Sequence, residues 1–217
     1  RYFVQAPKEL HGSGIDLMKE GEEETPHYID WIIAEIPQNG TVAVNALATS
    51  NSNWEMLQEK LSAKNITLKD QPLLKEIWTD RNPGAKKNPI FVHPVGRAGK
   101  SVAEKLADIR QKMEGLGASV HIISSLDDVA WTLNLRGSDV QSNPVFLGYI
   151  ILTKNEAKLF VDLEKLEVEA IKQMDESLVK MMPYEEFFTE LQNIKNETVL
   201  ISPNSNQSIF EALKAEN

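Results

Sequence analysis

Residues 80–100, DRNPGAKKNPIFVHPVGRAGK, constrain the fold more than any other part of the chain, because the periodic spacing of apolar residues stops there. The stretch holds three prolines and three glycines. Each proline fixes φ and drives the preceding residue towards extended conformations, which is typical of an ordered linker lying over a surface. We therefore predict a first domain at residues 1–83, a Pro/Gly-rich linker at 84–100 and a second domain at 101–217. A chain of 217 residues is long enough for two small domains with cores of their own.

The first domain shows an α/β pattern. The segment TPHYIDWIIAEIP predicts a helix between Pro26 and Pro37, because its isoleucines share one helical face. Residues 41–49, TVAVNALAT, are rich in β-branched and small apolar residues and predict a buried strand. A second helix follows, with Trp54, Leu57 and Leu61 on one face.

The second domain begins with a helix from residue 102, where Ser101 and Glu104 have the spacing of a capping box and Gly115 and Gly117 end the apolar stripe. The strand SVHIISS and the short helix LDDVAWTLNL follow. PVFLGYIILT and KLFVDL predict a hairpin, then come helical stretches at residues 165–174 and 184–191, the strand TVLIS and a last helix. The order α-β-α-β-β-α-α-β-α predicts a mixed sheet flanked by helices on one or both faces.

Composition excludes several classes of function. The net charge of −9 disfavours nucleic acid as a partner, because affinity for phosphates depends on clustered Lys and Arg. No apolar run approaches the ~18 residues of a membrane helix, so we expect no membrane span. The opening RYFVQA shows no basic-then-apolar leader, so we expect no signal peptide. The absence of cysteine rules out disulfides and cysteine-ligated zinc and suits a reducing compartment.

No pattern predicts a catalytic or metal site. The four histidines, His11, His27, His93 and His121, have no shared metal spacing, and HExxH, GxSxG and a phosphate-binding glycine loop are all missing from the sequence. His121 lies in an apolar strand and is interpreted as a structural, buried or half-buried histidine.

Residues 125–146 place Arg136, Asp139 and Asn143 at the end of an apolar helical run. In one interpretation the helix ends near residue 135, its dipole favours the cation, and the loop leads into a strand at residue 145. That account leaves Asp139 and Asn143 without a role. In the other, all three lie on one exposed loop, where guanidinium, carboxylate and amide contact a peptide ligand or an adjoining domain.

Three motifs, in this order, resemble aminopeptidase P (Xaa-Pro aminopeptidase) in its long, three-domain form: EIWTDRNP, NPIFVHPVGRAGKSVAEKLADIR and LDDVAWTLNLRGSDVQSNPVFLGYIILT. This family belongs to the creatinase, prolidase and methionine aminopeptidase superfamily. The opening RYFVQAPKELHGSGIDLMKEG is similar to the later part of its first domain. The resemblance implies an α/β fold of the creatinase N-terminal type, a mixed sheet flanked by helices, with one partial copy and one complete copy.

In that family two metal ions, usually manganese, lie in a C-terminal domain that supplies two Asp, two Glu and one His as ligands. The chain ends at LKAEN, about where its second domain would lead into that catalytic domain. The resemblance therefore implies a non-catalytic N-terminal fragment without a cofactor of its own. Its implied partners are its own C-terminal domain, proline-containing peptides and a second copy in a homodimer, and its implied location is the cytoplasm.

Two functions remain open. In the first, the parent removes the N-terminal residue from Xaa-Pro peptides, and this segment serves assembly and substrate access. In the second, the parent is a catalytically inactive relative, and this segment is a peptide- or protein-binding module. In either case the candidate substrate-binding or interdomain residues are Arg136, Asp139, Asn143 and His93.

Overall fold

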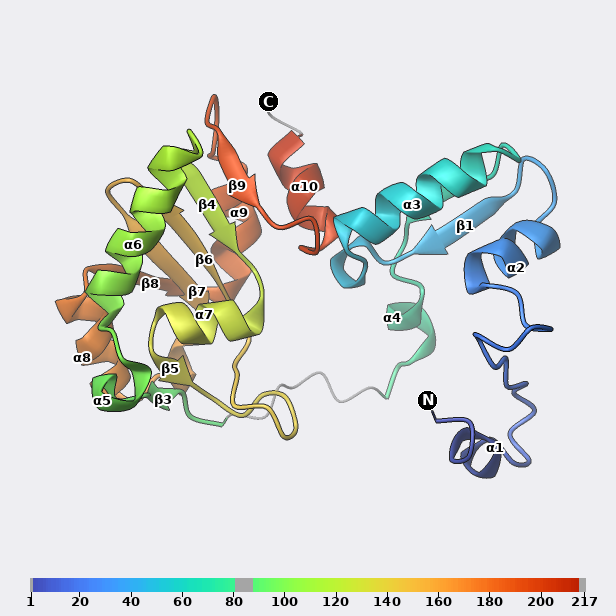
Figure 1. Cartoon of the computed structure of the whole chain (residues 1–217), viewed down its shortest axis with the longest axis horizontal. Coiled ribbons are helices and arrows are strands. Elements are labelled where there is room, and N and C mark those ends of the chain that lie inside the picture. The colour runs from blue at the N-terminus through green and yellow to red at the C-terminus, as the bar shows by residue number, and fades with distance from the viewer. Residues whose placement is uncertain (1, 81–87, 215–217) are drawn as a thin grey trace. The chain divides into compact units, whose positions relative to one another are not determined.

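The computed structural model describes residues 2–80 and 88–214, and its helices and strands are labelled in Figure 1. The chain divides into two compact units, one of residues 1–45 and 52–73 and one of residues 46–51 and 74–217. The boundary predicted between residues 83 and 84 falls within residues 81–87, outside the described part. Among the described residues, no helix has the length and apolar character needed to cross a membrane.

The first unit pairs two short parallel strands, β1 and β2, in the register Thr41↔Thr67 to Val44↔Asp70. Its core is formed by Ile29, Leu57, Leu61 and Ile66. The two predicted helices and the strand are present, but the strand is shorter than expected because residues 46–48 turn into a 3-10 helix. The sequence does not predict the second strand, β2, because two of the four residues of TLKD are charged. The elements of this unit are α1 (Ala6–Glu9), α2 (Tyr28–Glu35), β1 (Thr41–Val44), α3 (Asn51–Ser62) and β2 (Thr67–Asp70), while η1 (Ala46–Ala48), between β1 and α3, is assigned to the second unit.

The second unit contains a five-stranded mixed sheet in the order β8-β7-β6-β4-β9. The β4–β6 and β6–β7 pairs are antiparallel, while β4–β9 and β7–β8 are parallel. The strands are β4 (Val120–Ile123), β6 (Gly148–Thr153), β7 (Ala157–Val161), β8 (Val179–Pro183) and β9 (Val199–Ile201). The helices packed with the sheet are α6 (Val102–Gly115), α7 (Leu126–Thr132), α8 (Val168–Glu176), α9 (Phe187–Leu191) and α10 (Gln207–Lys214).

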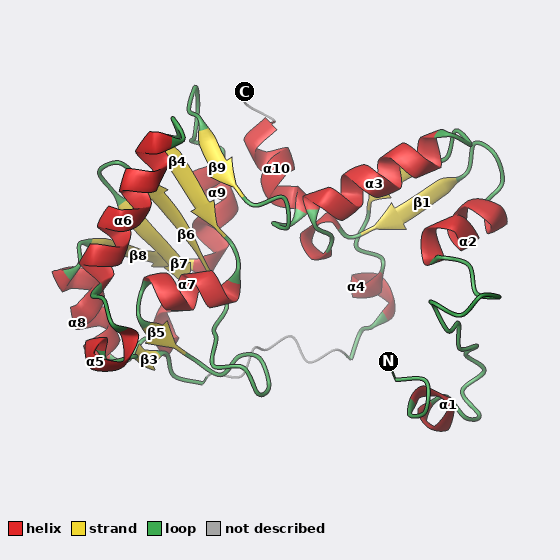
Figure 2. Ribbon diagram, viewed as in Figure 1, coloured by secondary structure: helices red, strands yellow, loops and turns green. Residues whose placement is uncertain are grey.

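Helices cover both faces of this sheet (Figure 2). Ile150 and Leu152 of β6 pack into the core shared with α6, α7 and α8, whereas Ile151 between them packs into the core shared with α9 and α10. Because successive side chains of a strand point to opposite faces, a strand covered on both sides is apolar throughout. This confirms the predicted fold class, a mixed sheet flanked by helices, and explains the long apolar run in GYIILT.

Several local features were predicted correctly. Ser101 and Glu104 form the capping box of α6, and β6 and β7 form the hairpin. The helix predicted to end near residue 135 ends at Thr132, because Asn134 takes a positive φ of 51° and β5 (Leu135–Arg136) begins. The strand β8 was not predicted, because VKMMP is short and ends in proline.

The described part of the predicted linker, residues 88–100, belongs to the second unit. Ile90 is fully buried in the main core, and β3 (Phe91–Val92) pairs antiparallel with β5. A short helix, α5 (Val95–Ala98), follows, and α4 (Leu74–Ile77) lies earlier in the chain. Residues 84–87 of that linker lie outside the described residues.

The packing of α6 predicts a contrast between two leucines. Leu106 is buried in the core and Leu116, at the end of the helix, is 67% exposed. Leu106→Ala should lower the free energy of unfolding by about 2–5 kcal/mol, because it leaves a cavity. Leu116→Ala should change it by less than about 0.5 kcal/mol. Urea denaturation of the two variants checks this, and equal losses would contradict the orientation of α6.

Candidate functional site

The four candidate residues occupy two neighbouring parts of the second unit. His93 and Arg136 lie at the β3–β5 pair, whereas Asp139 and Asn143 lie in the loop between β5 and β6. The structure therefore does not place Arg136, Asp139 and Asn143 together on one exposed loop, and that expectation is wrong.

Arg136 is half-buried and ends strand β5, opposite Phe91. Its Nη1 donates to the carbonyl oxygens of Ala130 at 3.0 Å and Leu135 at 2.8 Å. Ala130 lies in the last turn of α7, where exposed carbonyls and the helix dipole favour a cation. These contacts are those of the first interpretation, in which Arg136 stabilises the end of the preceding helix.

Lys105 and His93 are bound to the same short segment. Lys105 is 2% exposed, and its Nζ donates to the carbonyl of Trp131 at 2.8 Å and to Oδ1 of Asn134 at 2.7 Å. The same Nζ lies 4.1 Å from the centroid of the Trp131 ring, a cation–π contact. The backbone N–H of His93 donates to the carbonyl of Asn134 at 2.7 Å. Asn134 thus connects α6, α7 and the β3–β5 pair.

These contacts bring His93, Lys105 and Arg136 to one segment, and Arg97 lies near enough for its charge to act on His93; we call these four residues the basic corner. The pKa of His93 is lowered from its ordinary value by desolvation and by the positive charges of Arg136, Arg97 and Lys105. Burial, and then the charge of Arg136, lowers the pKa of Lys105. Desolvation is the larger cause of both pKa shifts, and the neighbouring like charges, which disfavour the charged form, add to it.

Asp139 lies in a buried ion pair. Its Oδ1 accepts from Nζ of Lys165, and the two side chains are 1% and 3% exposed. Its Oδ2 accepts from the N–H of Leu147 at 2.8 Å, and its own N–H donates to the carbonyl of Val145 at 3.0 Å. Asp139 therefore fixes the loop against the segment after β7, from a position that water does not reach.

Asn143 closes a tight turn in that loop. Its N–H donates to the carbonyl of Val140 at 3.2 Å, and Ser142 has a positive φ of 62°. Its own carbonyl accepts from the N–H of Val145 at 2.9 Å. The described contacts of Asn143 are those of a turn residue leading into β6.

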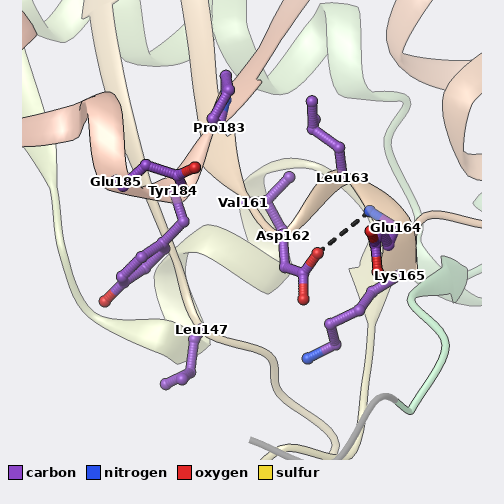
Figure 3. Close-up of a pocket in the computed structure, with 9 residues that line it drawn as sticks. All are labelled: Leu147, Val161, Asp162, Leu163, Glu164, Lys165, Pro183, Tyr184 and Glu185. Carbon is purple, nitrogen blue, oxygen red and sulfur yellow. Dashed lines mark hydrogen bonds between the residues drawn. The ribbon is translucent and has the colours of Figure 1, made fainter. Parts of the chain in front are cut away.

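A pocket of about 440 Å³ opens beside the buried ion pair (Figure 3). It lies where β7 and β8 end, next to η2 (Leu163–Lys165) and η3 (Tyr184–Glu186). Burial, together with a hydrogen bond to Tyr149, raises the pKa of Tyr184, which therefore stays neutral. The wall combines apolar and acidic side chains and consists of Leu147, Val161, Asp162, Leu163, Glu164, Lys165, Pro183, Tyr184 and Glu185.

The pocket depends on the ion pair behind it. Lys165 and Leu147 both line the pocket, and Asp139 bonds to both. Asp162 caps η2 by accepting from the N–H of Glu164 at 3.1 Å, the dashed line in Figure 3. Since Asp139 neutralises Lys165, the remaining charges at the wall are carboxylates.

Within residues 2–80 and 88–214, no three His, Asp or Glu side chains come close enough to hold a metal ion. His121 is half-buried, as expected, and its Nδ1 lies 2.9 Å from the carbonyl oxygen of Leu200. The described residues therefore offer no cluster that fits a metal centre.

Residues 81–217 match the family model of the creatinase/prolidase N-terminal domain. The chain belongs to this family. Its second unit is accordingly a creatinase/prolidase N-terminal domain, and the basic corner and the pocket are features of that domain.

Relatives and a solved structure extend the likeness beyond the matched domain. The chain is 38% identical to a probable Xaa-Pro aminopeptidase P of Arthroderma gypseum over 87% of its length, and 34% identical to aminopeptidase P2 of Arabidopsis thaliana over 99%. It spans 30% and 31% of those proteins. The crystal structure of the X-prolyl aminopeptidase from Caenorhabditis elegans, described as a cytosolic enzyme with a di-nuclear active site, superposes with a TM-score of 0.88 at 27% identity. That match covers 96% of this chain and 35% of the enzyme.

Sequence reasoning missed three basic residues of this creatinase/prolidase N-terminal domain: Arg97, Lys105 and Lys165. Lys105 falls on the core-facing side of α6, and Lys165 follows the apolar strand β7. A lysine at the apolar spacing of an amphipathic helix is a signal that could have identified Lys105, because a buried lysine needs acceptors. Nothing local in the sequence pairs Lys165 with Asp139, which lies 26 residues away.

The buried ion pair predicts a large loss of stability when one partner is removed. Asp139→Asn should lower the free energy of unfolding by about 3–5 kcal/mol, because it leaves the Lys165 charge buried and unpaired. The double variant Asp139→Asn/Lys165→Met should recover part of that loss. Asp127→Asn, at the exposed start of α7, is the matched control and should lose no more than about 1 kcal/mol. Equal losses for Asp139→Asn and Asp127→Asn in urea denaturation would contradict the burial of the pair.

Proposed function

We propose that this chain is the non-catalytic N-terminal part of a proline-specific metallo-aminopeptidase, where it serves assembly of the enzyme and access of substrates. The observation that supports this most is the likeness to the C. elegans X-prolyl aminopeptidase over nearly the whole chain. The curated relatives have the same kind of name and are about three times longer than the matched segment.

The chemistry is assigned to a separate catalytic domain. The described residues do not fit a di-nuclear metal centre, so two divalent ions, manganese in the family that the sequence resembles, would be bound outside this chain. In this proposal the longer protein removes the N-terminal residue from peptides with proline in second position. No step of that reaction is assigned to the residues described here.

The surroundings of β5 and the loop after it are proposed to face the catalytic domain and its peptide. Asp139 holds that loop in place. Asn143 and the basic corner, in this proposal, contact the adjoining domain or the substrate. A homodimer and a cytoplasmic location complete the proposal. Both are drawn from the family resemblance, and the location also agrees with the structural neighbour, which is described as a cytosolic enzyme.

The proposal predicts a division of activity. The longer protein should release the first residue of a peptide such as Ala-Pro-Ala and should bind divalent metal. This chain alone should cleave no Xaa-Pro peptide and should retain no transition metal after dialysis, measured by metal analysis. About one Mn or Zn per purified chain, or a longer protein that binds peptides without cleaving them, would contradict the proposal; the second result would favour a peptide-binding module.

Arg136 allows a second test in the longer protein. Arg136→Ala should lower kcat/KM by roughly 10–100-fold if the guanidinium orients the peptide or the catalytic domain. Arg136→Lys, which keeps the charge, should retain more of the activity. The melting temperature of each variant of this chain is the control, because Arg136 also bonds to the end of α7. A fall in melting temperature with unchanged kcat/KM would leave Arg136 a structural residue only.

A further inference from the structure

The basic corner gathers His93, Arg97, Lys105 and Arg136 in a chain whose net charge is −9. In the described part of the chain, no ion pair joins any of these four side chains to a carboxylate, whereas Lys100, Lys158 and Lys165 each pair with one. Like charges repel, and a desolvated cation without a counter-charge is unfavourable. The corner therefore has an excess of positive charge that the described residues do not balance.

The basic corner is also preorganised, because the side chain of its most buried residue, Lys105, is held in one position. Lys105 is almost fully buried and is held by Trp131 and Asn134. Neutral acceptors and an aromatic face offset part of the unfavourable burial, but they supply no negative charge. The amide of Asn134 is itself held, since its Nδ2 donates to the carbonyl of Lys100 at 2.8 Å.

The outer members retain donors for a ligand. Both described side-chain hydrogen bonds of Arg136 use Nη1, and no described bond uses Nη2 or Nε. Arg97 is exposed, and His93 is half-buried beside them. A guanidinium held by one nitrogen presents its other edge in a fixed direction, which suits a carboxylate.

Apolar surface adjoins these donors. Phe91, the strand partner of Arg136, is 42% exposed. Trp131, whose ring is in cation–π contact with Lys105, is 50% exposed. A small inorganic anion would leave both rings uncovered. A carboxylate on a peptide with an apolar side chain would cover them.

We propose that the basic corner is a binding site for a peptide carboxylate, contacted by Arg136, Arg97 and His93 above the buried Lys105, with Phe91 and Trp131 receiving the adjacent apolar side chain. The site belongs to this chain alone. It is therefore testable, and would stand, even if the proposed peptidase role failed.

The test uses the whole 217-residue chain and short probes, observed by NMR. Nα-acetyl-Ala-Leu with a free C-terminal carboxylate and Nα-acetyl-Glu-Leu amide each present one carboxylate, and Nα-acetyl-Ala-Leu amide presents none. At least one of the two carboxylate peptides should bind, and whichever binds more tightly identifies a chain terminus or an acidic side chain as the source. Binding should raise the pKa of His93, because an added negative charge favours the imidazolium.

Two variants localise the effect. Arg136→Gln should raise the dissociation constant of the better peptide roughly tenfold or more, as expected for a charge-assisted hydrogen bond. Arg97→Gln, at an exposed position without a described side-chain bond, should raise it by about two- to fivefold while leaving the fold intact. Lys154→Gln removes the same unit charge in the β6–β7 turn and should have no effect.

The proposal is overturned if the amide peptide binds as tightly as both carboxylate peptides. It is also overturned if inorganic phosphate shifts His93 and neither carboxylate peptide does. Binding that Arg97→Gln and Arg136→Gln leave unchanged, in variants shown to be folded, would place the peptide elsewhere.

Discussion

The ion pair between Asp139 and Lys165 joins two segments that would otherwise be independent, the loop before β6 and the 3-10 turn after β7. Both groups are buried, so neither charge is stable without the other. The second carboxylate oxygen of Asp139 fixes the start of β6 through Leu147. One interaction therefore sets the register of the loop, the wall of the pocket and the point at which the central strand begins.

The sequence was sufficient where an element is long and periodic. The capping box at Ser101 and the hairpin were predictable from local spacing, and so was the arrangement of the sheet between helices. Prediction failed where tertiary contacts decide the conformation. The strand β3 has only two residues and lies between prolines, so it shows no alternation of apolar and polar residues. It forms a strand only because β5 pairs with it.

The candidate site shows the same limit. The sequence indicated Arg136, Asp139, Asn143 and His93, but it could not show that Asp139 points inward, because its partner Lys165 lies beyond a hairpin. Nor could it show that Lys105, on the buried side of α6, belongs beside His93, since only the β3–β5 pair brings those segments together. The residues were found more readily than their directions, because a side chain's direction depends on a partner distant in sequence.

The structural and binding roles of Arg136 do not exclude each other. Its bond to the last turn of α7 removes rotamer freedom from a long side chain before any ligand arrives. A ligand that meets an already ordered guanidinium loses less free energy to ordering than one that must immobilise it. The helix end, the buried Lys105 and the fixed Asn134 thus hold positive charge at one place on the surface, and the contacts that make Arg136 look purely structural are those that would make it an effective partner for a carboxylate.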